Sequence, residues 1–240
     1  MTPDTLKLVF AWYVVFIFSA VLHEAAHALA AWKLGDATAY QGGQVSLDPI
    51  PHIQRAPFGM ILIPLVTCFM YKGGWMLGWA NAPYDPLWAR EFPRRAALMA
   101  LAGPVANLLV VIAAAIAIRI GLAMDAFMQP TAEDLHVGLW LTQVTVAPEG
   151  GGFSHGLAMI LSMLFSLNLV LFTLNLMPFP PLDGSGVLPL FMPRRYARRY
   201  MDFVQQPLAA SVGLILVLVL FNQIFGVIFI LGRGLLYLGA

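Results

Sequence analysis

Residues 6–32 read LKLVFAWYVVFIFSAVLHEAAHALAAW, and this stretch decides the fold class. It is apolar except for Lys7 and a polar group formed by His23, Glu24 and His27. A helix needs roughly 20 mostly apolar residues to cross the hydrocarbon core of a bilayer, so the stretch is long enough to span it. The apolar run of a signal peptide is shorter, roughly 7–15 residues, so we expect a retained membrane helix.

The composition of the whole chain agrees with a membrane protein. Of its 240 residues, 60% are hydrophobic and 10% are charged, and the mean hydropathy is +0.80. Soluble domains carry about 25% charged residues, which argues against a water-soluble globule. Disorder is excluded because ample apolar surface can be buried. The net charge of +1 indicates no nucleic-acid partner, and the single cysteine, Cys68, excludes a disulfide framework.

Four further stretches are long and apolar. Those over 96–122 and 156–177 are uninterrupted, and the one over 208–238 is rich in Leu, Ile and Val, whereas the one over 58–79 contains four glycines and a proline. We therefore expect one all-α polytopic membrane domain over residues 1–240, with about four transmembrane helices. The core helices are predicted over 6–33, 96–122 and 156–177, the C-terminal helix over 208–238, and a re-entrant or hairpin segment over 58–79.

The distribution of arginine predicts the topology. Residues 80–95 contain three arginines and residues 178–207 contain four, whereas residues 123–155 contain neither Lys nor Arg. Because Lys and Arg are enriched in cytoplasmic loops, we expect the first two loops on the cytoplasmic side and the third outside. The segment over 58–79 would then begin and end on the cytoplasmic side, as a hairpin does. An ordinary span with weak charge bias remains the alternative.

The polar group in the first helix has the spacing of a metal site. His23 and His27 are four residues apart, so a helix places both imidazoles on one face. Two imidazoles in this arrangement can bind one metal ion, and Glu24 beside them can accept a proton from water at the open metal position. Ionisable residues within a membrane span are costly and mark function. The alternative is a polar patch that packs against a neighbouring helix.

A catalytic zinc ion usually has three protein ligands, so a third ligand is expected at a similar depth. Asp183 is the candidate, because it follows a proline-rich break over 178–181 that ends the preceding apolar span. It lies eleven residues before Arg194, and His23 lies ten residues before Lys33, so a comparable depth is feasible. Asp before Gly is also common in ordinary turns, and spacing alone leaves both interpretations open.

Three motifs together resemble those of the site-2 protease family of intramembrane zinc metallopeptidases. They are HEAAH at 23–27, Gly-Pro-Val-Ala-Asn at 103–107, and Asn-Leu-Met-Pro-Phe-Pro-Pro-Leu-Asp-Gly at 175–184. The first and third motifs are specific, and the second is weak alone. The resemblance extends over most of the chain, from His23 to about Leu188, and looks like that of a compact bacterial-type member without a PDZ domain.

The resemblance implies a zinc-dependent intramembrane endopeptidase that hydrolyses peptide bonds within or near the transmembrane segment of membrane-protein substrates. It implies one Zn²⁺ ion with His23, His27 and Asp183 as ligands, and Glu24 as the catalytic base. The implied partners are single-span membrane proteins, such as an anti-sigma factor or a signal-peptide remnant, and the lipid bilayer. The implied location is the bacterial inner membrane, with the active site toward the cytoplasmic side.

Three residues are candidates for contact with the substrate. Asn107 and Asn175 can hold the oxyanion or the substrate backbone, or they can hydrogen-bond between helices. Val45 lies in the stretch over 42–47, which resembles the short β-like loop after the metal helix in compact family members and could pair with an extended substrate.

Two other functions remain open. The same residues could serve a membrane metal-binding or transport protein, or a catalytically silent family member. A transporter needs further ligands along a path, whereas a protease needs one base beside the metal. Glu24 therefore favours the enzyme.

Overall fold

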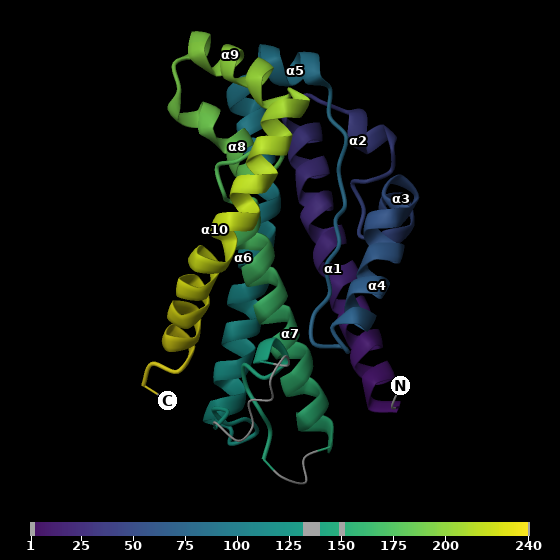
Figure 1. The fold of residues 1–240 in the computed structure, drawn as a ribbon, viewed down its shortest axis with the longest axis vertical. Coiled ribbons are helices and arrows are strands. Elements are labelled where there is room, and N and C mark those ends of the chain that lie inside the picture. The colour runs from purple at the N-terminus through teal and green to yellow at the C-terminus, as the bar shows by residue number, and fades with distance from the viewer. Residues whose placement is uncertain (1–2, 132–139, 149–151, 240) are drawn as a thin grey trace.

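The computed structural model describes residues 3–131, 140–148 and 152–239 (Figure 1). In these residues four helices are long and apolar enough to cross a membrane: α1 (Pro3–Leu34), α6 (Pro93–Ala123), α7 (Gly152–Asn175) and α10 (Pro207–Leu236). Helices satisfy their own backbone hydrogen bonds, which the hydrocarbon core cannot do for them. The prediction of an all-α polytopic membrane protein is confirmed.

Helices α1, α6 and α7 form the core of the bundle. Buried apolar side chains form one continuous core cluster, which includes Trp12, Phe16, Ile118, Met163 and Phe165. Helix α10 lies outside this core, packs mainly on α7, and exposes most of its apolar side chains (yellow in Figure 1). An apolar face of this kind is compatible with lipid, so α10 has the surface of a peripheral membrane helix.

Short helices gather at one end of the bundle, at the top of Figure 1. There α5 (Pro86–Glu91) contacts α9 (Arg194–Val204) through an ion pair of 2.9 Å between Arg90 Nε and Asp202 Oδ1. Both arginine-rich loops therefore lie at the same end, as the charge pattern predicts. The loop after α6, which contains η2 (Trp140–Thr142), lies at the opposite end (Figure 1). Further short helices are α2 (Thr38–Gln41), α8 (Asp183–Val187) and η3 (Leu188–Phe191).

Residues 49–85 form a hairpin beside α1. Helix α3 (Pro49–Arg55) bends by 113° into a π-helical turn, η1 (Phe58–Leu62), which continues as α4 (Ile63–Met70). At the tip, Gly73 lies against Leu8, near the N-terminal end of α1. The chain then returns in an irregular, non-helical form to the other end of α1, where the Asp85 amide donates to the Asp36 carboxylate at 2.8 Å. Of the two predicted alternatives, the segment has the form of a hairpin.

The β-like loop predicted over 42–47 is a turn followed by a bend, not a strand. Two side chains explain this difference. Gln44 Nε2 donates to the Asn81 carbonyl at 3.0 Å, and the imidazole of His52 bonds to the Ser46 carbonyl at 3.0 Å. These bonds fix a compact loop, and in the described part of the chain β pairing is limited to one isolated bridge elsewhere. The loop supports the returning arm of the hairpin at Asn81.

Candidate metal centre

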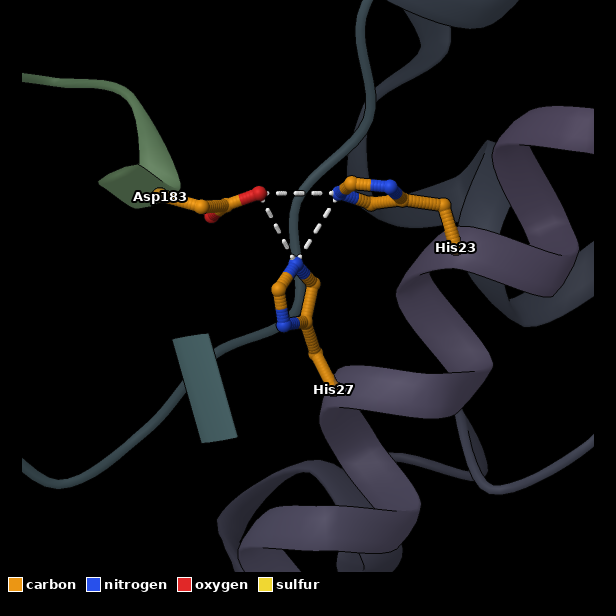
Figure 2. A group of neighbouring side chains, drawn as sticks. All are labelled: His23, His27 and Asp183. Carbon is orange, nitrogen blue, oxygen red and sulfur yellow. Dashed lines mark hydrogen bonds and ion pairs between the residues drawn. The ribbon is translucent and has the colours of Figure 1, made fainter. Parts of the chain in front are cut away.

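Two histidines of α1 and one aspartate of α8 meet inside the bundle (Figure 2). The Nε2 atoms of His23 and His27 are 2.9 Å apart, and Oδ2 of Asp183 lies 3.1 Å from the first and 3.2 Å from the second. Both histidines are buried, and Asp183 is partly buried. The structure thus brings together the three residues that the sequence suggests as metal ligands.

Asp183 reaches α1 because the chain turns sharply after α7. Proline lacks the amide hydrogen that a helix needs, and three prolines between 178 and 181 end this helix. Gly184 lies so close to the end of α7 that a Cβ would collide with backbone carbonyl oxygens there. Gly213 of α10 similarly approaches the Pro180 carbonyl, which a Cβ would displace. These two glycines permit the backbone contacts that place Asp183 beside the histidines.

The outer nitrogens of both imidazoles are bound to α6. The Nδ1 atom of His27 donates to the Met99 carbonyl at 2.8 Å, and a carbonyl oxygen can only accept. The proton of a neutral His27 is therefore on Nδ1, and its Nε2 presents a lone pair toward His23 and Asp183. The Nδ1 atom of His23 bonds to Asn107 Oδ1 at 2.5 Å, so its Nε2 also faces the centre. Electron-pair donors that converge in this way indicate a cation site.

The donor set and its spacing fit a zinc ion. Tetrahedral zinc binds imidazole nitrogen and carboxylate oxygen at about 2.0–2.2 Å, which places ligand atoms roughly 3.3 Å apart. The three atoms here are separated by 2.9, 3.1 and 3.2 Å. Three protein ligands leave a fourth position for water or substrate, as in catalytic zinc sites. His23, His27 and Asp183 would hold the ion.

Gly103 of α6 clears the space in front of the two imidazoles. A Cβ at this position would collide with Nε2 of both His23 and His27. Any side chain here would occupy the place where the ligand atoms converge. The weak Gly-Pro-x-x-Asn motif therefore has a physical basis at both ends, because Gly103 provides room and Asn107 binds His23.

A protein-family model for peptidase family M50 matches residues 11–220, which include the whole metal centre. The chain belongs to peptidase family M50, the site-2 protease family. The predicted resemblance is thereby confirmed. Membership makes this chain a zinc metallopeptidase by family, and the donor set described above agrees with that metal.

Curated relatives of this M50 peptidase carry the same assignment. "Putative zinc metalloprotease YwhC" of Bacillus subtilis (strain 168) is 35% identical over 211 residues, which is 87% of this chain and 78% of the relative. "Putative zinc metalloprotease Rip2" of Mycobacterium tuberculosis (strain ATCC 25618 / H37Rv) is 30% identical over 214 residues, which is 89% of this chain and 70% of the relative. No solved structure matches the chain.

Glu24 of the M50 peptidase lies next to His23 but outside the ligand group. It is 7% exposed, and its oxygens are not among the fully buried side-chain atoms that lack a partner in the described residues. An ionisable side chain within a membrane helix is costly and marks function. Glu24 therefore lies beside the ligand group without being part of it.

The other predicted site residues are placed differently. Asn107 is fully buried and binds His23. Asn175 ends α7 and is half-buried, and Val45 is half-buried in the loop after α2; the described structure gives neither a hydrogen bond to the ligand group. Tyr84, which the sequence analysis does not single out, is half-buried on the returning arm of the hairpin. Burial, and secondarily the nearby Asp183 carboxylate, raise the pKa of the Tyr84 phenol, so its hydroxyl stays protonated and can donate.

In the Gly103→Ala variant we expect zinc affinity to fall at least about tenfold, because the added methyl group displaces both imidazoles. Zinc affinity is measured by chelator competition on the detergent-solubilised full chain. Gly226→Ala is the matched control, because this helical glycine of α10 has open space where a Cβ would lie. Wild-type zinc affinity in Gly103→Ala would contradict the described geometry.

Proposed function

We propose that this M50 peptidase uses one zinc ion to cleave peptide bonds within or near the transmembrane segments of membrane proteins. The observation that carries the proposal is the position of the ligand atoms of His23, His27 and Asp183 inside a bundle of membrane helices. At a rise of 1.5 Å per residue, the two histidines lie roughly 10–17 Å along α1 from Leu34, where α1 ends. This depth supports a scissile bond below the membrane surface.

The proposed chemistry needs an activated water and a proton carrier. Zinc, when bound, polarises the scissile carbonyl and lowers the pKa of bound water to about 7. Glu24 takes one proton from the attacking water and delivers it to the leaving amide nitrogen as the C–N bond breaks. The protonated phenol of Tyr84, near Asp183, is available to donate a hydrogen bond to the substrate. Asn175 is a further candidate for this contact.

The returning arm of the hairpin has one free hydrogen-bonding edge. The backbone groups of residues 77, 79, 81 and 85 bond to the rest of the protein, through Leu77 N–H, Trp79 N–H, the Asn81 carbonyl and Asp85 N–H. In an extended chain, alternate residues point their amides to opposite sides. Residues 80, 82 and 84 therefore present their amides on the other side, where the described structure gives them no partner.

A substrate must leave its helical form before its amides can be cleaved, and a free edge can bind the extended form by strand addition. We therefore assign this role to residues 80–84 rather than to the loop over 42–47 that contains Val45. The loop contributes indirectly, since Gln44 holds Asn81 in place. Tyr84 lies at the end of this edge, and the Asp183 carboxylate contributes to the raised pKa of its phenol.

In the Ala82→Pro variant we expect kcat/KM to fall about 2- to 10-fold, which corresponds to the loss of one hydrogen bond between this edge and the substrate. Proline removes the amide hydrogen on the free edge, whereas the control Ala82→Ser keeps it. The measurement is cleavage of a transmembrane peptide in detergent or vesicles, with zinc content determined in parallel. If Ala82→Pro cleaved as fast as Ala82→Ser with equal zinc content, strand addition at this edge would be refuted.

The proposed setting follows from the arginine-rich end of the bundle. We assign this end to the cytoplasm and place the protein in a bacterial inner membrane, with the metal centre toward the cytoplasmic side. Suitable substrates are single-span membrane proteins, such as anti-sigma factors, or signal-peptide remnants. The alternatives, a metal transporter or a catalytically silent member, lack a structural observation that favours them.

The proposal is tested by incubating purified protein with a generic single-span substrate. Cleavage is followed with and without a zinc chelator and after zinc is added back, and mass spectrometry locates the cleaved bond. We expect cleavage within or near the transmembrane segment that stops with the chelator and returns with zinc. Cleavage that persists in the chelator, or that occurs only in soluble segments far from the membrane, would contradict the proposed function.

A further inference from the structure

A chain of buried amide and hydroxyl groups extends from His23 into α7. Asn107 Nδ2 donates to Asn168 Oδ1 at 2.8 Å, and Asn168 Nδ2 donates to Ser19 Oγ at 2.9 Å and to the Leu164 carbonyl at 2.8 Å. Ser19, Asn107 and Asn168 are all fully buried. Ser19 lies one helical turn before His23, so the hydrogen bonds connect α1, α6 and α7 in a closed ring.

The Leu164 carbonyl sets the direction of every bond in this chain. It can only accept, so the amide nitrogen of Asn168 must face it, and Oδ1 of Asn168 must face Asn107. Asn107 then has to present its amide nitrogen to Asn168 and its oxygen to His23. An oxygen acceptor opposite Nδ1 requires that Nδ1 of His23 carries the proton. The lone pair of His23 is consequently on Nε2, where the ligand atoms converge.

The two histidines therefore achieve the same tautomer by different means. His27 bonds directly to a backbone carbonyl, that of Met99, whose role as an acceptor is fixed. His23 bonds to a side-chain amide, which can present either oxygen or nitrogen unless something orients it. For His23 the fixed acceptor is the Leu164 carbonyl of α7. This carbonyl orients the amide of Asn168, which orients the amide of Asn107, which presents its oxygen to His23 on α1.

We propose that Asn168 is a positioning residue of the metal centre, which acts through Asn107 to hold His23 in the tautomer that binds metal. This inference deepens the proposed function and rests on its zinc ion. Without the Asn168 oxygen, Asn107 loses the partner that orients its amide, and the amide can turn its nitrogen toward His23. That orientation favours a lone pair on Nδ1 and places the proton of His23 on Nε2, in the position of the metal.

The test is a double-mutant cycle read out as zinc affinity, which requires no substrate. We expect Asn168→Leu to weaken zinc binding about 10- to 100-fold in the solubilised full chain, as loss of an outer hydrogen bond does in other metal sites. In the background of Asn107→Leu, adding Asn168→Leu should weaken binding no further, because Asn168 acts through Asn107. Ser166→Ala is the control, since Ser166 is a buried residue of α7 whose hydroxyl has no partner among the described residues.

The Asn168→Asp variant tests the direction of these hydrogen bonds and keeps a polar side chain at position 168. Burial favours the neutral form of a carboxyl group, and its partners at this position, Asn107, Ser19 and the Leu164 carbonyl, are all neutral. The introduced carboxyl group therefore donates through its hydroxyl to Leu164 and accepts from Asn107 through its other oxygen, and zinc affinity should stay within about threefold of wild type. If Asn168→Leu does not fold, a large loss in Asn168→Asp overturns the proposal by itself.

The outcomes separate this inference from the proposed function. Wild-type affinity in a folded Asn168→Leu protein, or losses that multiply in the double variant, would overturn the positioning role and leave the peptidase proposal intact. A wild-type chain that binds no zinc would overturn both.

Discussion

In the Glu24→Gln variant we expect kcat to fall about 10³-fold while zinc binding stays at the wild-type level. Glutamine has nearly the same size as glutamate but cannot accept a proton from water. Glu24 is not among the ligand atoms, so the metal centre of His23, His27 and Asp183 should remain complete. The variant therefore separates proton transfer from metal binding. Cleavage is measured with a transmembrane substrate at saturating concentration, and zinc is measured on the same preparation.

The matched control for this variant is Glu91→Gln, because Glu91 lies exposed at the end of α5. Like Glu24→Gln, it replaces a carboxylate by an amide and removes one negative charge, but it does so away from the ligand group. It should cleave within about twofold of wild type. Retention of more than a tenth of the wild-type kcat in Glu24→Gln would assign the proton transfer to another group. Loss of zinc together with activity would instead indicate that Glu24 supports the ligand shell.

Asp183→Ala is expected to weaken zinc binding by at least about 100-fold. Loss of an outer hydrogen bond to a ligand already costs 10- to 100-fold in metal affinity, and loss of a ligand costs more. Without the carboxylate, the zinc ion would lose one of its three protein ligands. The Nε2 atoms of His23 and His27, which are 2.9 Å apart, would also lose the negative charge that faces them. The measurement is chelator competition on the solubilised full chain, with cleavage lost in parallel.

Asp202→Ala serves as the control for Asp183→Ala. Asp202 is exposed and pairs with Arg90 at the surface, where an ion pair contributes about 0–1 kcal/mol. This variant should therefore keep both its zinc and its activity. If Asp183→Ala bound zinc as tightly as Asp202→Ala, the third ligand would have to be a different residue.

The sequence predicts the parts of this fold that depend on local physics. A membrane span follows from the length and apolarity of one continuous stretch, so α1 over 3–34 lies close to the predicted 6–33. The pairing of His23 and His27 follows from the helical repeat alone. Charge counts in short loops placed both arginine-rich segments at one end, and the ion pair between Arg90 and Asp202 agrees.

The third ligand depends on contacts that no local pattern contains. Whether Asp183 is a turn residue or a ligand is decided by how the chain folds back after α7. That path requires Gly184 to lie against the carbonyls at the end of α7, and Gly213 of α10 to lie against the Pro180 carbonyl. Spacing left the question open, and only the resemblance to the family pointed to the ligand. Gly103 is similar, because its importance appears only when α6 lies against the imidazoles of α1.

The loop over 42–47 does not have the β-like form predicted for it. The glycines of the loop over 42–47 suggested an extended segment, but Gln44 and His52 fold the loop compactly. The non-helical returning arm, residues 75–85, begins inside the predicted re-entrant segment and continues past its end. Its apolar residues have no period that separates helix from extended chain. Asn168 was missed for another reason, since one amide in an apolar span has no meaning until its partner Asn107 is known.

The central claim is that two imidazoles of α1 and the carboxylate of Asp183 hold one zinc ion inside the membrane bundle. Zinc K-edge X-ray absorption, combined with metal analysis of the purified full chain, tests it most directly. We predict one zinc per chain, with imidazole scattering from His23 and His27 and nitrogen or oxygen ligands at about 2.0–2.2 Å. A spectrum without imidazole scattering, or with a sulfur ligand at about 2.3 Å from Cys68, would contradict the claim.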